Sequence, residues 1–198
     1  MVLPIYTYGQ PVLREPARPV DPDAPDFDAD AFRQLLADMV ETMHEAHGIG
    51  LAAPQIGRSL RVFVVDLSPY AEEIAEEHDG QTPEWARGPF ALINPETAPL
   101  EDAQEEAFEE GCLSIPDLRE DVVRPDAVRL RYLTEDFEPV ELIATGMLAR
   151  VVQHELDHLD GVLFVDYLSA LRKRIVRRRL RRMAEGEVEA EYPIQPPA

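Results

Sequence analysis

The spacing of apolar residues along the chain predicts three helices. Within residues 28–47 they recur every three or four positions, which gives a helix with one buried face. Gly48 follows this stretch, so we expect the helix to end there. A second helix is expected over residues 145–160, followed by Gly161, and a third over residues 168–183.

Short runs rich in β-branched and aromatic residues predict strands at 61–67 and 90–94. Two further runs, 127–133 and 139–144, flank the polar stretch 134–136 and predict a hairpin. Strands joined by a short turn run antiparallel. The sequence therefore predicts a mostly antiparallel sheet alongside the three helices.

Other segments stand out by composition. Six prolines among the first 25 residues prevent regular helix, so an extended arm with turns is expected there. Residues 68–89 are rich in Glu and Asp and predict an acidic surface insertion. The last segment, 186–198, carries Pro and Glu and is expected to be a flexible tail.

Length, composition and charge limit the class of protein. The 198 residues are 45% hydrophobic, which suits a single domain with its own core. No stretch has the roughly 18 uncharged apolar residues of a membrane span, and no signal peptide is recognisable, so we expect a cytoplasmic protein without a membrane partner. The formal net charge of −20 repels phosphates and argues against DNA binding.

His154, Glu155 and His158 form an H-E-x-x-H pattern within the second predicted helix. Residues four apart point the same way on a helix, so the two imidazoles could hold one metal ion. A metal makes hydroxide accessible near neutral pH, and the Glu155 carboxylate could carry a proton from water to a leaving amine. The pattern indicates hydrolysis, but it also fits histidines that face solvent or pack in a core.

Two histidines do not complete a catalytic metal site, which usually has three protein ligands and one open position. The chain has three other histidines, His44, His47 and His78, and a single cysteine, Cys112. The Cys112 thiol could be inert packing, a nucleophile or a metal ligand. A soft thiolate would suit zinc or ferrous iron, and the residue types alone leave these alternatives open.

Three segments, taken together and in order, resemble the peptide deformylase family. They are residues 48–57 (GIGLAAPQIG), 110–116 (EGCLSIP) and 153–161 (QHELDHLDG). Weaker similarity begins near Tyr8, so the resemblance implies a catalytic unit over residues 1–167. It also implies an α+β fold, a single domain in which mostly antiparallel sheets pack around a central metal-binding helix.

The resemblance implies metal-dependent hydrolysis of the N-formyl group on the terminal formylmethionine of new polypeptides, with release of formate. Cys112, His154 and His158 would bind one divalent ion, which is usually Fe²⁺ in such enzymes, with Zn²⁺, Ni²⁺ or Co²⁺ as substitutes. Glu155 would act as general acid and base.

The resemblance also implies a substrate site. The Gln55 side chain and the backbone N–H of Leu113 would donate hydrogen bonds to the oxyanion that forms at the formyl carbon, and losing one such donor typically costs on the order of 10²-fold in rate. Peptide-binding residues would be Ile49, Gly50, Phe108, Met147 and Arg119. Arg150 departs from the aliphatic residues expected near this pocket, so it would point outward or close an ion pair.

The basic run at 172–182 has eight Arg or Lys in eleven positions and lies in the helical unit 168–185. It could contact ribosomal RNA or neutralise the protein's own acidic surface. Two other functions stay open: a zincin-like metallopeptidase, which would need a ligand downstream of His158, and a ribosome-binding relative without catalysis.

Overall fold

A five-stranded antiparallel sheet forms the centre of the protein, which is described by a computed structural model over residues 1–197. The strand order is β2-β3-β4-β7-β8, and all neighbours are antiparallel. The strands are β2 (Gly50–Ala52), β3 (Val62–Val65), β4 (Phe90–Pro99), β7 (Ala127–Leu133) and β8 (Pro139–Thr145). The predicted hairpin is confirmed as β7-β8, whereas β2 was not predicted.

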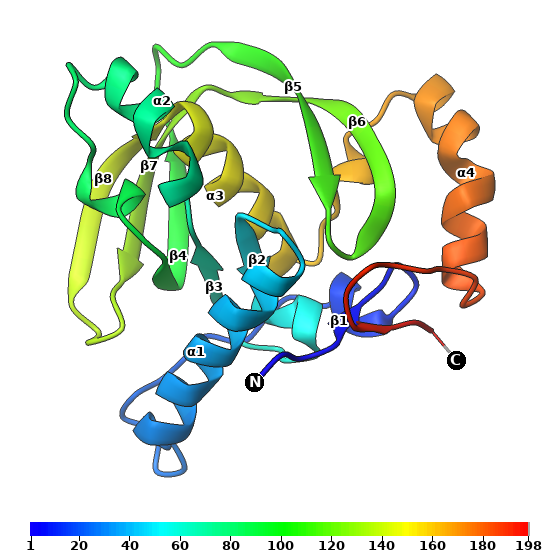
Figure 1. The fold of residues 1–198 in the computed structure, drawn as a ribbon, viewed down its shortest axis with the longest axis horizontal. Coiled ribbons are helices and arrows are strands. Elements are labelled where there is room, and N and C mark those ends of the chain that lie inside the picture. Colours follow the sequence, from blue (N-terminus) through cyan, green and yellow to red (C-terminus); the bar gives the residue numbers. More distant parts are fainter. Residues whose placement is uncertain (198) are drawn as a thin grey trace.

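Helices cover both faces of this sheet. Along β3, Phe63 and Val65 join one core cluster and Val62 and Val64 join another, because successive side chains of a strand point to opposite faces. Helix α3 (Gly146–Leu159) packs on the first face and α1 (Ala29–Glu45) on the second (Figure 1). Each such apolar side chain contributes about 1.5–3 kcal/mol when it is buried.

Helix α1 ends differently from the prediction. His47, not Gly48, adopts the left-handed conformation, with φ of 55°. The N–H of His47 donates to His44 O at 3.0 Å and that of Gly48 to Met43 O at 2.9 Å, the two bonds that close a Schellman motif. A Cβ on Gly48 would lie 2.7 Å from Leu113 Cδ1, so the glycine permits a close approach to the next motif.

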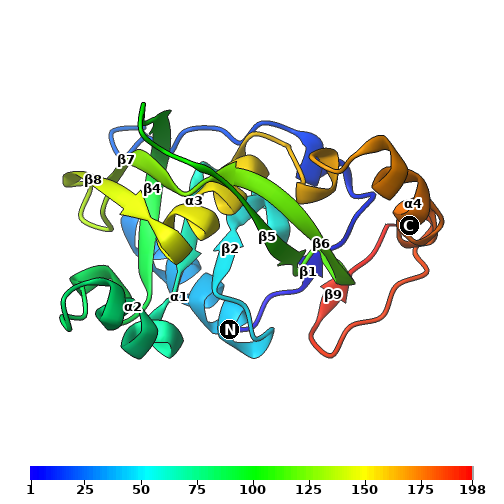
Figure 2. The same ribbon diagram turned by 90° about the horizontal axis from the view of Figure 1, so that it is seen from above.

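A long hairpin of β5 (Glu105–Cys112) and β6 (Ile115–Pro125) lies on the far side of α3, so that α3 is enclosed between hairpin and sheet (Figures 1 and 2). The sequence pattern did not predict these two strands. Alternate side chains of β6 are buried, but two of them are the charged residues Glu120 and Arg124. The sequence therefore lacks the regular alternation of apolar and polar residues that predicts a strand.

The acidic segment 68–89 is folded onto the protein surface. It contains 3-10 turns η3 (Ser68–Tyr70) and η4 (Glu84–Ala86) around α2 (Ala71–Glu77). Ile74 and Ala86 are buried, and Tyr70 and Trp85 pack against the core cluster under α3. The segment is therefore held by apolar contacts while most of its acidic side chains remain exposed.

The C-terminal region holds the third predicted helix, α4 (Ala170–Ala184), which begins after its N-cap Ser169. The segment 186–197, called here the C-terminal strap, corrects our expectation of a flexible tail. Its strand β9 (Ile194–Gln195) pairs in parallel with β1 (Ile5–Tyr6) of the N-terminal arm (Figure 2).

An alternation of apolar and acidic residues explains why the strap packs against the protein in a defined conformation. From residue 187 to 195, the partly buried positions are Val188, Ala190, Tyr192 and Ile194, and the exposed ones include Glu187, Glu189 and Glu191.

Three further 3-10 turns complete the fold: η1 (Pro11–Arg14), η2 (Ala53–Ile56) and η5 (Phe164–Asp166). Within residues 1–197, none of the helices has the length and apolar content to cross a membrane.

Candidate active site

Helix α3 brings His154 and His158 to the same side, one turn apart, as their spacing requires. Their ring centroids are 5.1 Å apart and the rings are nearly perpendicular. Leu148 and Val152, on the opposite side of the helix, are buried in the sheet core, so α3 presents the two rings toward the β5-β6 hairpin.

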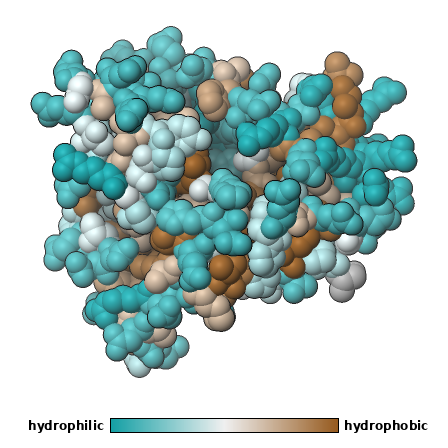
Figure 3. Space-filling model, in the orientation of Figure 1, coloured by the Kyte–Doolittle hydropathy of each residue, from teal (hydrophilic) through white to brown (hydrophobic). Residues whose placement is uncertain are grey.

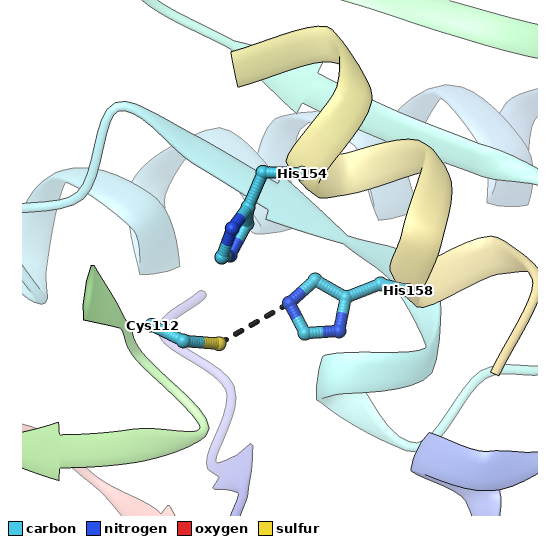
Figure 4. Close-up of side chains that lie close together, drawn as sticks. All are labelled: Cys112, His154 and His158. Carbon is cyan, nitrogen blue, oxygen red and sulfur yellow. Dashed lines mark hydrogen bonds between the residues drawn. The ribbon is translucent and has the colours of Figure 1, made fainter. Parts of the chain in front are cut away.

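Cys112 completes a cluster with the two histidines. It is the last residue of β5, and its Sγ lies 3.2 Å from His158 Nε2 (Figure 4). One ligand atom from each of Cys112, His154 and His158 lies within 4.8 Å of the others, which is close enough for all three to hold one ion. The sequence prediction that these residues meet in space is thus matched by the geometry.

Glu110 fixes the orientation of His154. Its Oε2 lies 2.9 Å from His154 Nδ1, which leaves the other ring nitrogen for the cluster. Burial would raise the pKa of the Glu110 carboxyl, but His154 and Arg124 outweigh this effect and lower that pKa to about 2. Glu110 is therefore a carboxylate at neutral pH.

Arg124 and Arg150 hold Glu110 in place. Arg124 donates from Nε and Nη2 to the two Glu110 oxygens at 2.7 and 3.0 Å, and from Nη1 to Asp157 at 2.7 Å. Arg150 donates to Glu110 Oε1 at 3.1 Å and to Val122 O at 3.0 Å. Of the two orientations considered for Arg150, the buried ion pair is therefore the observed one.

The two imidazoles differ in their affinity for protons. Burial would lower the pKa of His154, but nearby Cys112 and Glu110 hold it well above its ordinary value. Burial and the charge on His154 both lower the pKa of His158, well below its ordinary value. A neutral His158 can act as an electron-pair donor, as a metal ligand must.

Glu155 lies next to the cluster and is almost fully buried. Burial raises the pKa of its carboxyl to about 7. Within the described residues, its Oε2 has no hydrogen-bond partner. Strand β2 approaches it so closely that a Cβ on Gly50 would collide with Glu155 Oε1, which gives this glycine a steric reason that sequence reasoning did not consider.

Gln55, on η2, reaches the cluster from the other side. Its Oε1 accepts the N–H of Ala52 at 2.8 Å, which orients the side-chain amide. Its Nε2 then points at Ser114 Oγ, 3.2 Å away, and at Cys112 Sγ, 3.6 Å away. Leu113, between these two, begins the two-residue turn that joins β5 to β6.

A pocket of about 1100 Å³ opens beside the cluster, and Figure 3 shows a hollow in this face of the protein. Its lining includes all five residues that we predicted to bind substrate: Ile49, Gly50, Phe108, Met147 and Arg119. It also includes residues without a predicted role, notably Arg150, Val151 and the strap residues Glu189 to Tyr192. No local sequence pattern could predict that the strap lines this pocket, because the strap and the other lining residues are far apart in sequence and meet only in the folded protein.

Comparisons with known proteins agree with this geometry. A profile of the polypeptide deformylase family matches residues 2–174. A peptide deformylase of Salinibacter ruber is 54% identical over 195 residues, which cover 98% of this chain and 94% of the relative. One of Flavobacterium johnsoniae is 41% identical over 97% of this chain and 94% of the relative.

Solved structures show the same fold. A peptide deformylase of Legionella pneumophila superposes with a TM-score of 0.74 at 36% identity, over 94% of this chain and 98% of that one. One of Synechococcus elongatus, in complex with actinonin, has a TM-score of 0.71 at 39% identity, over 89% and 87% of the two chains. The chain therefore belongs to the polypeptide deformylase family.

Proposed function

We propose that Cys112, His154 and His158 hold the metal ion with which this peptide deformylase removes the N-formyl group from new polypeptides. The observation that carries the proposal is the convergence of one thiol and two imidazoles within 4.8 Å beside a pocket. Three protein donors with one accessible side are typical of catalytic metal sites. A thiolate and two imidazoles form a donor set that suits zinc and ferrous iron.

Glu155 is the proposed general acid and base. When bound, the metal supplies a Lewis acid for the formyl carbonyl and makes hydroxide accessible near neutral pH. The Glu155 carboxyl, whose pKa is raised to about 7 by burial, can take a proton from water and return it to the departing amine. The formyl C–N bond breaks, formate leaves, and the peptide keeps a free amino terminus.

Gln55 and Leu113 are the proposed oxyanion donors. The Gln55 amide is already oriented by its bond from Ala52, so its N–H groups need little reorganisation. The backbone N–H of Leu113 lies in the turn directly after Cys112. Such fixed donors stabilise charge that develops only in the transition state.

The pocket would take the first methionine of the substrate. Ile49 and Met147 are partly buried against the sheet core, and Phe108, which is 47% exposed, lies 5.7 Å from the Arg150 guanidinium carbon. These side chains give an apolar lining for a methionine thioether. Arg119 pairs loosely with Glu109 at 3.8 Å and would lie near the peptide entrance.

The decisive experiment compares two peptides. Protein purified without oxygen and loaded with Fe²⁺ should release formate from N-formyl-Met-Ala-Ser and leave both peptide bonds intact. The unformylated peptide should stay uncut. Its cleavage would favour the alternative hypothesis of a zincin-like metallopeptidase. No formate from a protein that retains its metal would contradict the proposal. Loading with Zn²⁺, Ni²⁺ or Co²⁺ tests our choice of Fe²⁺ as the cellular ion.

Glu155→Gln separates metal binding from catalysis. The amide cannot transfer the proton, so kcat should fall by about 10² to 10⁴-fold while one metal ion per chain is retained. Glu135→Gln, on an exposed residue that does not line the pocket, is the control and should leave kcat unchanged. Near-normal turnover by Glu155→Gln would assign the proton transfer to another group.

A second proposal concerns helix α4 and the ribosome, where formylated chains emerge in the cytoplasm. Within residues 1–197, Arg172 pairs with Glu120 and Arg179 with Asp117, but Arg174, Arg177 and Arg178 form no ion pair. Beside these three lie exposed Leu171 and Ile175, at 67% and 57%, and Figure 3 shows hydrophobic surface over this end of the helix.

That free face suits a ribosomal RNA surface better than the protein's own acidic groups, because its three arginines have no partner within the described residues. Replacing Arg174, Arg177 and Arg178 by Gln should reduce cosedimentation with ribosomes, most strongly at low salt. The same change at Arg129 and Arg131 of β7 is the control. Equal cosedimentation of both variants would refute this contact.

A further inference from the structure

We propose that the C-terminal strap completes the active site, and that Tyr192 is a positioning residue for the Leu113 backbone. The Tyr192 hydroxyl donates to Leu113 O at 2.8 Å, although 79 positions separate the two residues in sequence. The inference rests on the proposed role of Leu113 as an oxyanion donor. It adds a function for the strap, which the catalytic motifs do not include.

The turn that carries Leu113 is held by hydrogen bonds from outside the hairpin. Cys112 pairs with Ile115 across the hairpin, and Leu113 and Ser114 form the two-residue turn between them. The Leu113 and Ser114 carbonyls are bonded from outside the hairpin: Leu113 O accepts from Tyr192, and Ser114 O accepts from the Tyr8 N–H at 2.8 Å.

The two supports are joined to each other. Ile5 N–H donates to Pro193 O at 2.9 Å, and Thr7 N–H donates to Gln195 O at 3.2 Å. Gln10 Nε2 adds a bond to Pro196 O at 2.8 Å. The N-terminal arm and the strap therefore form one frame around the turn.

This frame restrains the direction of the Leu113 N–H, which matters for catalysis. A hydrogen bond to Leu113 O restrains the peptide group between Leu113 and Ser114. The Leu113 N–H belongs to the adjacent peptide group, so holding the first group limits the rotations of the Leu113 backbone that would turn this N–H away. An oxyanion donor is effective only when its geometry is set before the reaction. Misplacement of a group in an active site by about 1 Å can cost on the order of 10²-fold in rate.

Tyr192 is suited to this role by its surroundings. Its ring packs against the core cluster under α1 and at the same time lines the pocket. Burial raises the pKa of Tyr192, so the hydroxyl keeps its proton and acts as a donor. A bond made by a ring that is packed on one side costs little side-chain entropy.

Tyr192→Phe tests the inference because it removes one hydroxyl and keeps the ring. We expect kcat for N-formyl-Met-Ala-Ser to fall about tenfold with KM nearly unchanged, since the lost interaction acts in the transition state. Tyr132→Phe removes the same atom from a half-buried tyrosine on β7, outside the pocket, and should leave kcat unchanged. An unchanged kcat in Tyr192→Phe would overturn the positioning role.

Amide hydrogen exchange supplies a readout that does not need activity. The Tyr8 N–H, which donates to Ser114 O in the same turn, should exchange faster in Tyr192→Phe than in the wild type, while amides of β3 keep their protection. Equal exchange at Tyr8 would overturn the inference even if the protein showed no deformylase activity. A wild type without formate release would refute the proposed function alone, so the two failures are distinguishable.

Discussion

His154 Nδ1 lies 2.9 Å from Glu110 Oε2, so a carboxylate that is almost fully buried fixes one imidazole of the metal cluster. Glu110 stands two residues before Cys112 on β5 and thus couples the strand to helix α3. A partner of this kind sets which ring nitrogen is available and how the ring is turned. The loss of Glu110 should therefore lower the affinity of the cluster for its metal.

Glu110→Gln should weaken metal binding by about 10 to 100-fold, the usual cost of losing a partner behind a ligand histidine. Competition with a chromophoric chelator measures this directly. Glu109→Gln is a matched control, because the neighbouring side chain is exposed and points away toward Arg119. If both variants bind metal equally, Glu110 does not position His154.

Arg124→Met should destabilise the protein by about 3 kcal/mol, because it leaves the buried Glu110 carboxylate and the partly buried Asp157 carboxylate with one fewer counter-charge. Urea unfolding of the metal-free protein gives this value. Arg129→Met breaks an exposed pair with Glu141 and should cost about 0 to 1 kcal/mol. Equal losses would mean that burial of the Arg124 network has no energetic consequence.

Gly50→Ala should reduce activity strongly, because the added Cβ would displace the Glu155 carboxylate. Strand β2 is buried on all sides, so the backbone cannot shift freely to make room. The matched control is Gly88→Ala, where a Cβ would meet nothing within 4 Å. Wild-type kcat in Gly50→Ala would show that Glu155 has another productive position.

Removal of the metal should lower thermal stability. An ion at about 100 times its Kd stabilises the folded state by about 2.7 kcal/mol, and for a chain of this size that corresponds to about 5 to 10 °C in Tm. Differential scanning calorimetry of stripped and reloaded protein measures the shift. Cys112→Ser should show a much smaller shift, and an undiminished one would place the ion elsewhere.

Local sequence was sufficient for the three long helices, although not for α2, and for part of the candidate site. The 3.6-residue period located α1 and α3, and the spacing of His154 and His158 placed both rings on one side. The motifs around Gln55 and Cys112 added the remaining cluster residues through family resemblance. These features depend on residues that are close together along the chain, so a local sequence pattern is enough to predict them.

Tertiary structure alone decided the partners of the charged and terminal residues. Glu110, Arg124 and Arg150 come from β5, β6 and α3, and their ion pairs exist only because the hairpin lies across the helix. Tyr192 reaches Leu113 because β9 pairs with β1. Such contacts join residues far apart in sequence. They depend on how whole helices and strands pack together, and no local sequence pattern encodes that packing.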